Sequence, residues 1–452
     1  MSRHVLRAQE IDMTRGNLWK QILLFSLPLM LSNLLQVLFN MADLAVVGRC
    51  VGAIALGSVG STTMLIFLGT GILQGMGGGT NAVVARFIGA GDTENVKRST
   101  HTAILLCLLT GIMLLLAGQL LCHPILSLMG TKTELIDGAV LYLRFYMIGA
   151  PAMALYNYGN AILSAVGDTK RPLLYLTIAG ITNVLLNLFF VLVCDLGVCG
   201  VGLASALSQY LSAFLILRYL LQRGREQAAH GLVLSEIRLH PALALQILGI
   251  GIPAAIQYSL FAIANLVIQS GINSFDHTVV EGSAAAANAD SLVWDTMAAF
   301  YTACTSFIAQ NLGAGNKRRI RQSYGITLVY SAGIGLVLGG LLLLFPETFL
   351  SLFVTDAEVL AAGRTRLIIM AASYFISAFM DDATAAARGL GKSVMPTVIV
   401  ILGSVVYRIA WVSSIFAVLH TQEVLYLVYP TAWTLTAIAG NLYFLQQYRR
   451  LP

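Results

Sequence analysis

Long apolar runs separated by short polar stretches follow one another along the whole chain. Runs of about 20 residues are long enough for an α-helix to cross the hydrocarbon core of a bilayer. Residues 79–98 and 223–242 are polar or rich in glycine, and we expect them to be connectors. No secretory signal peptide is expected, because residues 1–19 are polar and mixed in charge. The pattern predicts twelve transmembrane helices, over residues 20–45, 52–78, 99–122, 138–164, 172–194, 199–222, 243–272, 283–309, 323–345, 361–387, 395–419 and 422–446.

The composition agrees with this pattern. Of the 452 residues, 57% are hydrophobic and 11% are charged, whereas a soluble domain carries about 25% charged residues. We therefore expect a polytopic membrane protein surrounded by lipid, with no residues left over for a soluble domain. In a membrane protein, the net charge of +6 has to be interpreted from the positions of the basic residues along the chain. We expect no nucleic-acid partner.

Lysine and arginine are distributed unequally among the connectors. The two termini and the connectors after each even-numbered span hold 21 of the 27 basic residues, including Lys317, Arg318, Arg319 and Arg321. Basic residues collect on the cytoplasmic side of a membrane. We therefore expect a multi-pass protein of the cell's inner (cytoplasmic) membrane with both termini in the cytoplasm.

The chain also repeats itself. "FIGAGDTENVKR" (87–98) returns as "NLGAGNKRRIRQ" (311–322), and "SAVGDTKRP" (164–172) returns as "RGLGKSVMP" (388–396) at the same spacing. Pro28 matches Pro253 at almost the same spacing. Since each half holds an even number of spans, both halves enter the membrane from the same side. The sequence predicts an all-α membrane protein with two six-helix bundles related by a pseudo-two-fold axis along the membrane normal. Transporters bind substrate between two such halves.

These repeats define the expected domains. We expect an N-lobe over residues 1–225, a cytoplasmic linker over 226–240 and a C-lobe over 241–452.

Five carboxylates fall within the predicted spans, at Asp43, Asp290, Asp295, Asp381 and Asp382. An intramembrane acid usually faces a cavity or an ion pathway. Asp290 lies near the outer end of its span, whereas Asp295 lies deeper, so the functional interpretation is stronger for Asp295. Arg408 is the basic residue that lies deepest inside a predicted span, and its side chain leans toward the cytoplasmic end of its helix. We expect an ion pair between Arg408 and Asp381 or Asp382.

The first half carries further polar residues. Asn183 and Asn187 lie at i and i+4 on one face of span 5. Tyr142 lies in the outer half of span 4, and Ser205 lies in span 6. Taken alone, such residues are often hydrogen-bonding contacts between helices. Together with Asp43 they offer a carboxylate, two amide oxygens and a hydroxyl, which suits a proton or a hard cation such as Na+.

Twelve spans in two parallel halves, "GAGD" after span 2 and "GDTKRP" after span 4 resemble the MATE (multidrug and toxic compound extrusion) family of transporters. The resemblance covers essentially the whole chain. It implies a V-shaped pair of bundles that exports amphipathic, often cationic, drug-like compounds against inward flow of H+ or Na+. It implies a monomer, no organic cofactor and an N-lobe cation site at Asp43, Tyr142, Asn183 and Ser205. Some members carry an aspartate at the position of Asn187. The asparagine of this chain gives the site less negative charge than it has in those members.

The second half departs further from the family. Many members place a glutamate in span 7 and an aspartate in span 10, whereas span 7 here holds no acid and Ser377 stands near the place of that aspartate. A C-lobe polar site is therefore either absent or rebuilt from Asp295, Asp381 and Asp382, with Arg408 nearby. The sequence offers no metal site beyond Na+ at Asp43 and Asn183.

Two other functions remain as alternatives. A flippase or exporter of lipid-linked saccharides has a similar architecture, but it should line its cavity with several basic residues. A membrane-embedded enzyme should carry a catalytic base or a metal ligand inside the spans, and no histidine lies there away from a span end.

Overall fold

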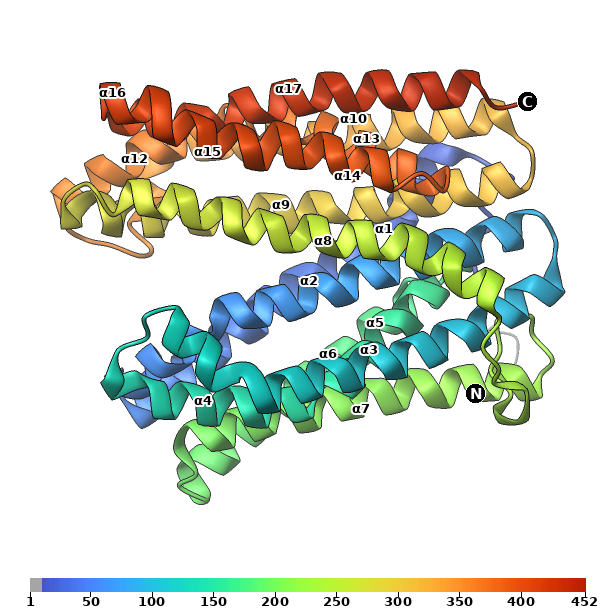
Figure 1. Cartoon of the computed structure of the whole chain (residues 1–452), viewed down its shortest axis with the longest axis horizontal. Coiled ribbons are helices and arrows are strands. Elements are labelled where there is room, and N and C mark those ends of the chain that lie inside the picture. Colours follow the sequence, from blue (N-terminus) through green and yellow to red (C-terminus); the bar gives the residue numbers. More distant parts are fainter. Residues whose placement is uncertain (1–9) are drawn as a thin grey trace. The chain divides into compact units, whose positions relative to one another are not determined.

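The computed structural model describes residues 10–452, and these residues form helices and no strands (Figure 1). The part of the N-terminal prediction that concerns residues 1–9 lies outside the described residues. Four π-helical turns, at Val47–Val51, Phe189–Val193, Ile401–Val406 and Val412–Phe416, extend or interrupt the α-helices. The first seven α-helices are α1 (Leu18–Val46), α2 (Ala53–Gly89), α3 (Thr93–Leu128), α4 (Thr133–Ile148), α5 (Ala150–Ala165), α6 (Lys170–Leu188) and α7 (Gly197–Arg225).

The remaining helices follow a short 3-10 turn at Leu234–Glu236. They are α8 (Pro241–Ile272), α9 (His277–Gly313), α10 (Lys317–Leu344), α11 (Pro346–Leu350), α12 (Ala357–Ala371), α13 (Tyr374–Gly389), α14 (Val394–Val400), α15 (Tyr407–Trp411), α16 (Ala417–Leu419) and α17 (Gln422–Arg449).

Every predicted span corresponds to a helix or a run of helices. By length and composition, eight helical segments of the described chain are able to cross a membrane, or ten if the bent pairs α4/α5 and α12/α13 each count as one span. The bends are 48° and 46°. The first follows from Gly149 and Pro151, since proline lacks the N–H that would continue the helical ladder. The helices α9 and α17 fall below that test, and α9 carries Asp290 and Asp295.

The predicted connector at 79–98 is wrong except at residues 90–92, because α2 continues to Gly89 and α3 begins at Thr93. Glycines here serve a close helix contact rather than a loop. A Cβ atom on Gly79 would lie 2.5 Å from the Ile247 carbonyl oxygen, and one on Gly75 would lie 2.4 Å from the Ala255 nitrogen. The backbones of α2 and α8 therefore meet directly, as small residues allow in membrane helices.

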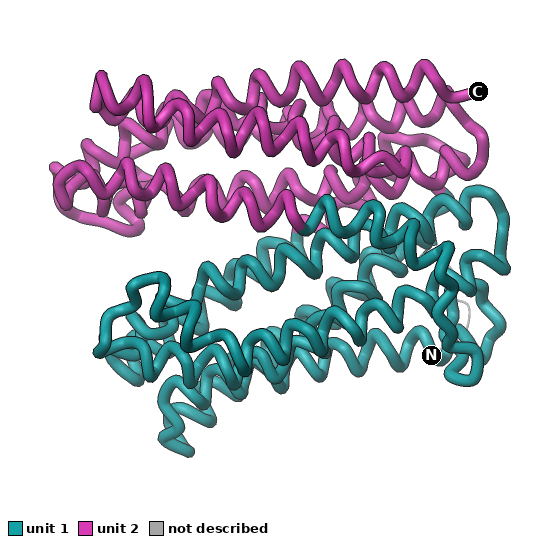
Figure 2. Tube along the Cα trace, in the orientation of Figure 1, with its two compact units in different colours: residues 1–12, 31–255 teal, residues 13–30, 256–452 magenta. Residues whose placement is uncertain are grey.

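The chain divides into two compact units (Figure 2). Unit 1 holds Leu31–Ala255 and the described residues before Met13, and unit 2 holds Met13–Met30 and Ile256–Pro452. Two helices are therefore shared: α1 begins in unit 2 and ends in unit 1, and α8 begins in unit 1 and ends in unit 2. The units differ from the predicted lobes in these two helical segments, and the lobe boundaries stay a prediction.

Equivalent glycine contacts hold each unit together. In unit 1, a Cβ atom on Gly138 of α4 would lie 2.6 Å from the Ser58 hydroxyl of α2. In unit 2, a Cβ atom on Gly282 of α9 would lie 2.5 Å from the backbone nitrogen of Gly363 on α12. The spacing that aligns Pro28 with Pro253 also aligns Gly282 with Gly57 of α2, whose added Cβ atom would lie 3.1 Å from the Leu135 side chain of α4. The internal repeat of the sequence thus returns as a repeated mode of packing.

The linker between α7 and α8 is anchored to unit 1. The His101 ring of α3 hydrogen-bonds to the backbone of Val233 at 3.1 Å, and Lys97 forms an ion pair with Glu236 at 2.5 Å. His230 is buried, and its Nε2 accepts a hydrogen bond from Arg223 Nε at 3.2 Å. Residues 226–240 are therefore an ordered part of the fold.

Candidate functional site

The polar residues predicted for the first half meet in one cluster within unit 1. The Asn187 amide donates to Asp43 Oδ1 at 2.5 Å, and the Ser205 hydroxyl donates to Asp43 Oδ2 at 3.4 Å. Asn183 donates to Ser205 Oγ and accepts from Asn187 Nδ2, both at 3.4 Å. Three helices, α1, α6 and α7, thus place four side chains in a closed network around one carboxylate.

Local backbone features explain why these helices meet here. A Cβ atom on Gly180 would lie 1.8 Å from the Phe39 ring, so this glycine lets α1 approach α6 one turn before Asn183. The π-helical turns Val47–Val51 and Phe189–Val193 begin shortly after Asp43 and Asn187. Such turns insert an extra residue into a helix and occur often at functional sites.

Tyr142 stands beside the cluster rather than inside its hydrogen-bond network. It is 4% exposed and packs with Val47, Val191 and Val201 in an apolar group. Its ring centroid lies 5.9 Å from that of Tyr146, and both phenols lie within the electrostatic reach of Asp43. We infer that Tyr142 forms part of an apolar wall next to the carboxylate.

One buried oxygen atom of the cluster receives no hydrogen bond. Asn187 is fully buried, and its Oδ1 has no hydrogen-bond donor. A buried acceptor without a donor is costly. Added to the Asp43 carboxylate, the Asn183 amide and the Ser205 hydroxyl, it completes an oxygen-rich donor set. These residues fit a proton shared by the carboxylate or a small hard cation such as Na+.

Unit 2 contains an ion pair that the sequence did not predict. Arg366 Nη2 donates to Asp290 Oδ2 at 2.6 Å, and the Tyr374 hydroxyl donates to Asp290 Oδ1 at 2.5 Å. Arg366 Nη1 also donates to the Ser283 hydroxyl at 2.6 Å and to its carbonyl oxygen at 3.1 Å. Arg366 is 7% exposed. It lies in the third turn of α12.

The other acids of unit 2 have partners of their own. Asp382 is fully buried and accepts a hydrogen bond from the Ser331 hydroxyl of α10. Asp381 lies within the electrostatic reach of Arg388, and Asp295 lies on α9. Among the described residues, no group of three or more acidic, histidine or cysteine side chains is placed to hold a metal ion. A C-lobe polar site at Asp295, Asp381, Asp382 and Arg408 stays a prediction.

The expected pair between Arg408 and Asp381 or Asp382 is wrong. Arg408 Nη1 instead donates to Asn265 Oδ1 of α8 at 3.0 Å. The reason is the rotation of α13 about its axis, which turns Asp382 toward Ser331. Sequence position gave the depth of these residues in the membrane but not the helix that each one faces.

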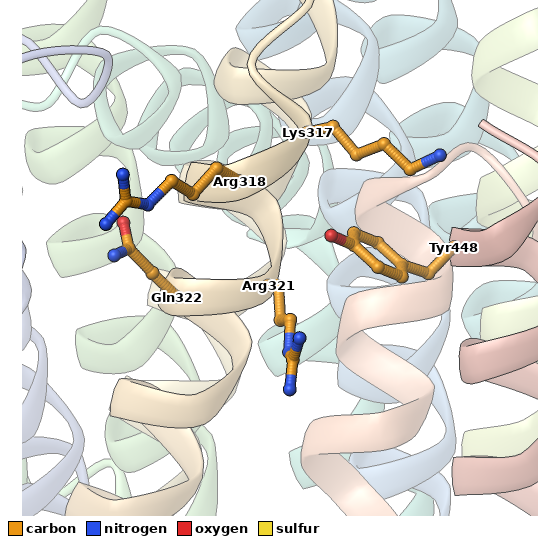
Figure 3. Close-up of a pocket in the computed structure, with 5 residues that line it drawn as sticks. All are labelled: Lys317, Arg318, Arg321, Gln322 and Tyr448. Atoms are coloured by element: carbon orange, nitrogen blue, oxygen red, sulfur yellow. The ribbon is translucent and has the colours of Figure 1, made fainter. Parts of the chain in front are cut away.

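A basic pocket lies at the predicted cytoplasmic end of unit 2. Lys317, Arg318, Arg321 and Gln322 of α10 and Tyr448 of α17 line it (Figure 3). The Lys317 ammonium lies 5.6 Å from the centre of the Tyr448 ring. These charges belong to the group that the sequence assigns to the cytoplasmic side.

The architecture defines the class first: this is a polytopic α-helical membrane protein. The family follows from comparison with known proteins. The MatE family model matches residues 28–189 and 253–411, so the chain belongs to the MATE family.

Individual relatives span most of the chain. The "probable multidrug resistance protein YoeA" of Bacillus subtilis is 27% identical over 431 residues, which cover 94% of this chain and 93% of the relative. A protein of Shewanella oneidensis named "FAD transporter" is 28% identical over 360 residues, 78% of each chain. A solved structure of a MOP superfamily transporter from Pyrococcus furiosus has a TM-score of 0.91 at 22% identity, covering 97% of this chain and 98% of that one. That likeness supports the fold.

Proposed function

We propose that this protein is a secondary active exporter that moves amphipathic, drug-like compounds out of the cell in exchange for inward H+ or Na+. The names of relatives such as YoeA support drug-like substrates. The observation that carries the coupling proposal is the cluster around Asp43. It holds one carboxylate, several oxygen acceptors and an unpaired Asn187 Oδ1 in a membrane-spanning region.

The chemistry follows from a carboxylate that exists in two states. The ionised Asp43 attracts a cation, while the protonated group presents a neutral hydroxyl to the same neighbours. A proton and a cation therefore compete for one position. Because Asn187 and Ser205 both donate to Asp43, a change in its charge alters contacts on α6 and α7 as well as α1. This links ion binding to the packing of unit 1, which is the coupling that alternating access requires.

The test is Asp43→Asn. Asparagine has nearly the same shape but does not titrate, and a neutral amide is less costly to bury than a charge. We expect normal yield and thermal stability, together with loss of drug efflux in everted vesicles under an imposed pH or Na+ gradient. Separate gradients also identify the coupling ion.

Asp137→Asn is the matched control, because this exposed carboxylate lies on α4 of the same unit. It should transport at the wild-type rate. Transport by Asp43→Asn at the wild-type rate, on equal amounts of folded protein, would mean that the coupling group lies elsewhere.

A further inference from the structure

Arg408 is a buried cation near the middle of a membrane-spanning segment. It lies within Val394–Leu419, a segment of 26 residues, and is 2% exposed. Its short helix α15 is flanked by π-helical turns at Ile401–Val406 and Val412–Phe416. A charge at this depth is costly and usually functional, and π-helical turns mark functional positions.

The surroundings of Arg408 satisfy its charge only in part. Nη1 donates to Asn265 Oδ1, and the guanidinium lies over the rings of Tyr429 and Phe261 at 4.6 and 5.7 Å from their centres. Nε is buried and has no acceptor. Neutral oxygen and aromatic faces stabilise a cation, but they do not neutralise it.

No carboxylate of the described chain forms an ion pair with Arg408. Three acids of unit 2 have other neighbours: Asp290 pairs with Arg366, Asp382 accepts from Ser331, and Asp381 lies within the electrostatic reach of Arg388. The phenol ring of Tyr429 is the aromatic face nearest to the guanidinium, with its centre 4.6 Å away. The fold thus holds a buried planar donor group with an unused N–H between two aromatic rings.

The internal repeat relates this position to the cluster of unit 1. The spacing that aligns Pro28 with Pro253 aligns Asp43 with Ile268, which is 1% exposed. The spacing that aligns residues 164–172 with 388–396 places Asn183 opposite Tyr407, the residue before Arg408. The second half therefore carries an apolar side chain in place of the acid, and a guanidinium next to the position of the Asn183 amide.

We propose that Arg408 and Asn265 bind the anionic head group, a carboxylate or a phosphate, of an amphipathic substrate. The inference rests on the proposed export function and names the class of compound exported. The guanidinium presents a fork of N–H donors that matches carboxylate and phosphate oxygens. Phe261 and Tyr429 provide the apolar surface for the rest of the molecule.

The test compares three ligands with one apolar body. Binding of 4-phenylbutyrate, 4-phenylbutylamine and 4-phenylbutanol is measured by calorimetry on the full chain in detergent. Wild type should bind the carboxylate most tightly. Arg408→Gln should weaken binding of the carboxylate roughly tenfold or more, the range lost with a charge-assisted hydrogen bond, and should change the other two by less than about twofold. Equal affinity of wild type for all three ligands would overturn the proposal.

A second variant protects the test against misfolding of Arg408→Gln. Asn265→Asp places a carboxylate beside Arg408 Nη1 and supplies the missing counter-charge from within the protein. It should fold at least as well as wild type, lose the preference for 4-phenylbutyrate and keep binding of 4-phenylbutylamine. An Asn265→Asp protein that still prefers the carboxylate refutes the proposal.

Arg388→Gln serves as the matched control. Arg388 is another arginine of unit 2 bonded to an amide, with Nη2 2.8 Å from Gln257 Oε1, and its removal should leave the ligand preference unchanged. These equilibrium measurements need no ion gradient. A chain that binds the anion but does not move it keeps this inference and loses the exporter proposal.

Discussion

Replacing Arg366 by methionine should be among the most damaging single changes in unit 2. Arg366 is 7% exposed and makes hydrogen bonds to Asp290 and to both oxygens of Ser283. The side chain of Asp290 is 25% exposed, so its charge also lies largely away from water. Arg366→Met removes all of these bonds at once and leaves a largely buried carboxylate with the Tyr374 hydroxyl as its remaining donor.

The magnitude follows from the number and type of bonds. A hydrogen bond to a charged group contributes about 1.5–3 kcal/mol, but bonds within one network do not add independently. Removing one partner of a buried ion pair costs about 3–5 kcal/mol, because the other charge stays buried. We therefore expect Arg366→Met to lower the free energy of unfolding by about 3–5 kcal/mol.

The assay is reversible unfolding in a detergent titration, followed by tryptophan fluorescence. Arg364→Met is the matched control, because Arg364 lies on the same helix and forms an exposed contact of 3.6 Å with Glu347. It should unfold like wild type. The double change Asp290→Leu with Arg366→Met should recover most of the loss, since it removes both charges. A loss below about 1 kcal/mol for Arg366→Met, the range of an exposed pair, would refute this reasoning.

Three further predictions concern other parts of the chain. Burial, with the charges of Arg223 and Arg171, lowers the pKa of His230 from 6.5 to about 4. Between these pH values the unfolded chain binds a proton that the folded protein does not, so the free energy of unfolding should be constant above pH 6.5 and fall by at most about 3 kcal/mol as the pH drops to 4. Thermal melts of His230→Gln should show a weaker dependence on pH. Cysteines introduced at Ala90 and Ala314 should resist a membrane-impermeant maleimide in intact cells, whereas one at Thr131 should react, and equal labelling of all three would contradict a cytoplasmic position for the GAGD and GAGN loops. Tyr142→Phe should keep at least half of the wild-type efflux rate in everted vesicles, because the Tyr142 hydroxyl makes no hydrogen bond to Asp43 in the described structure; loss of transport would assign that hydroxyl a direct role.

The site of unit 1 could be predicted because its signals are local or shared with a family. Asn183 and Asn187 lie at i and i+4 on one helix, which fixes their common face. The resemblance to MATE transporters supplied Asp43 and Ser205 as partners on other helices. The structure then joins all four side chains through hydrogen bonds.

The polar contacts of unit 2 could not be predicted in the same way. Apolar runs give the ends of a helix and the depth of a residue, but not the rotation of the helix about its axis. That rotation sends Asp382 to Ser331 and leaves Arg408 with Asn265. Arg366 was missed because it lies near the start of a predicted span, where a basic residue usually reaches water. The one signal in the sequence that pointed to a buried position was its alignment with Tyr142, under the repeat that aligns residues 87–98 with 311–322.

The sharing of α1 and α8 between the units bears on how such a chain could have arisen. A single six-helix half cut in the linker at 226–240 would lack the segment that completes its own unit: the first half would lack 241–255, and the second half would lack 13–30. An ancestor with one half alone would have had to exchange its first helix with another copy, as a domain-swapped dimer does. Gene fusion would then have turned that intermolecular exchange into a permanent one. Separately produced halves should accordingly fold well when they are made together and poorly when each is made alone.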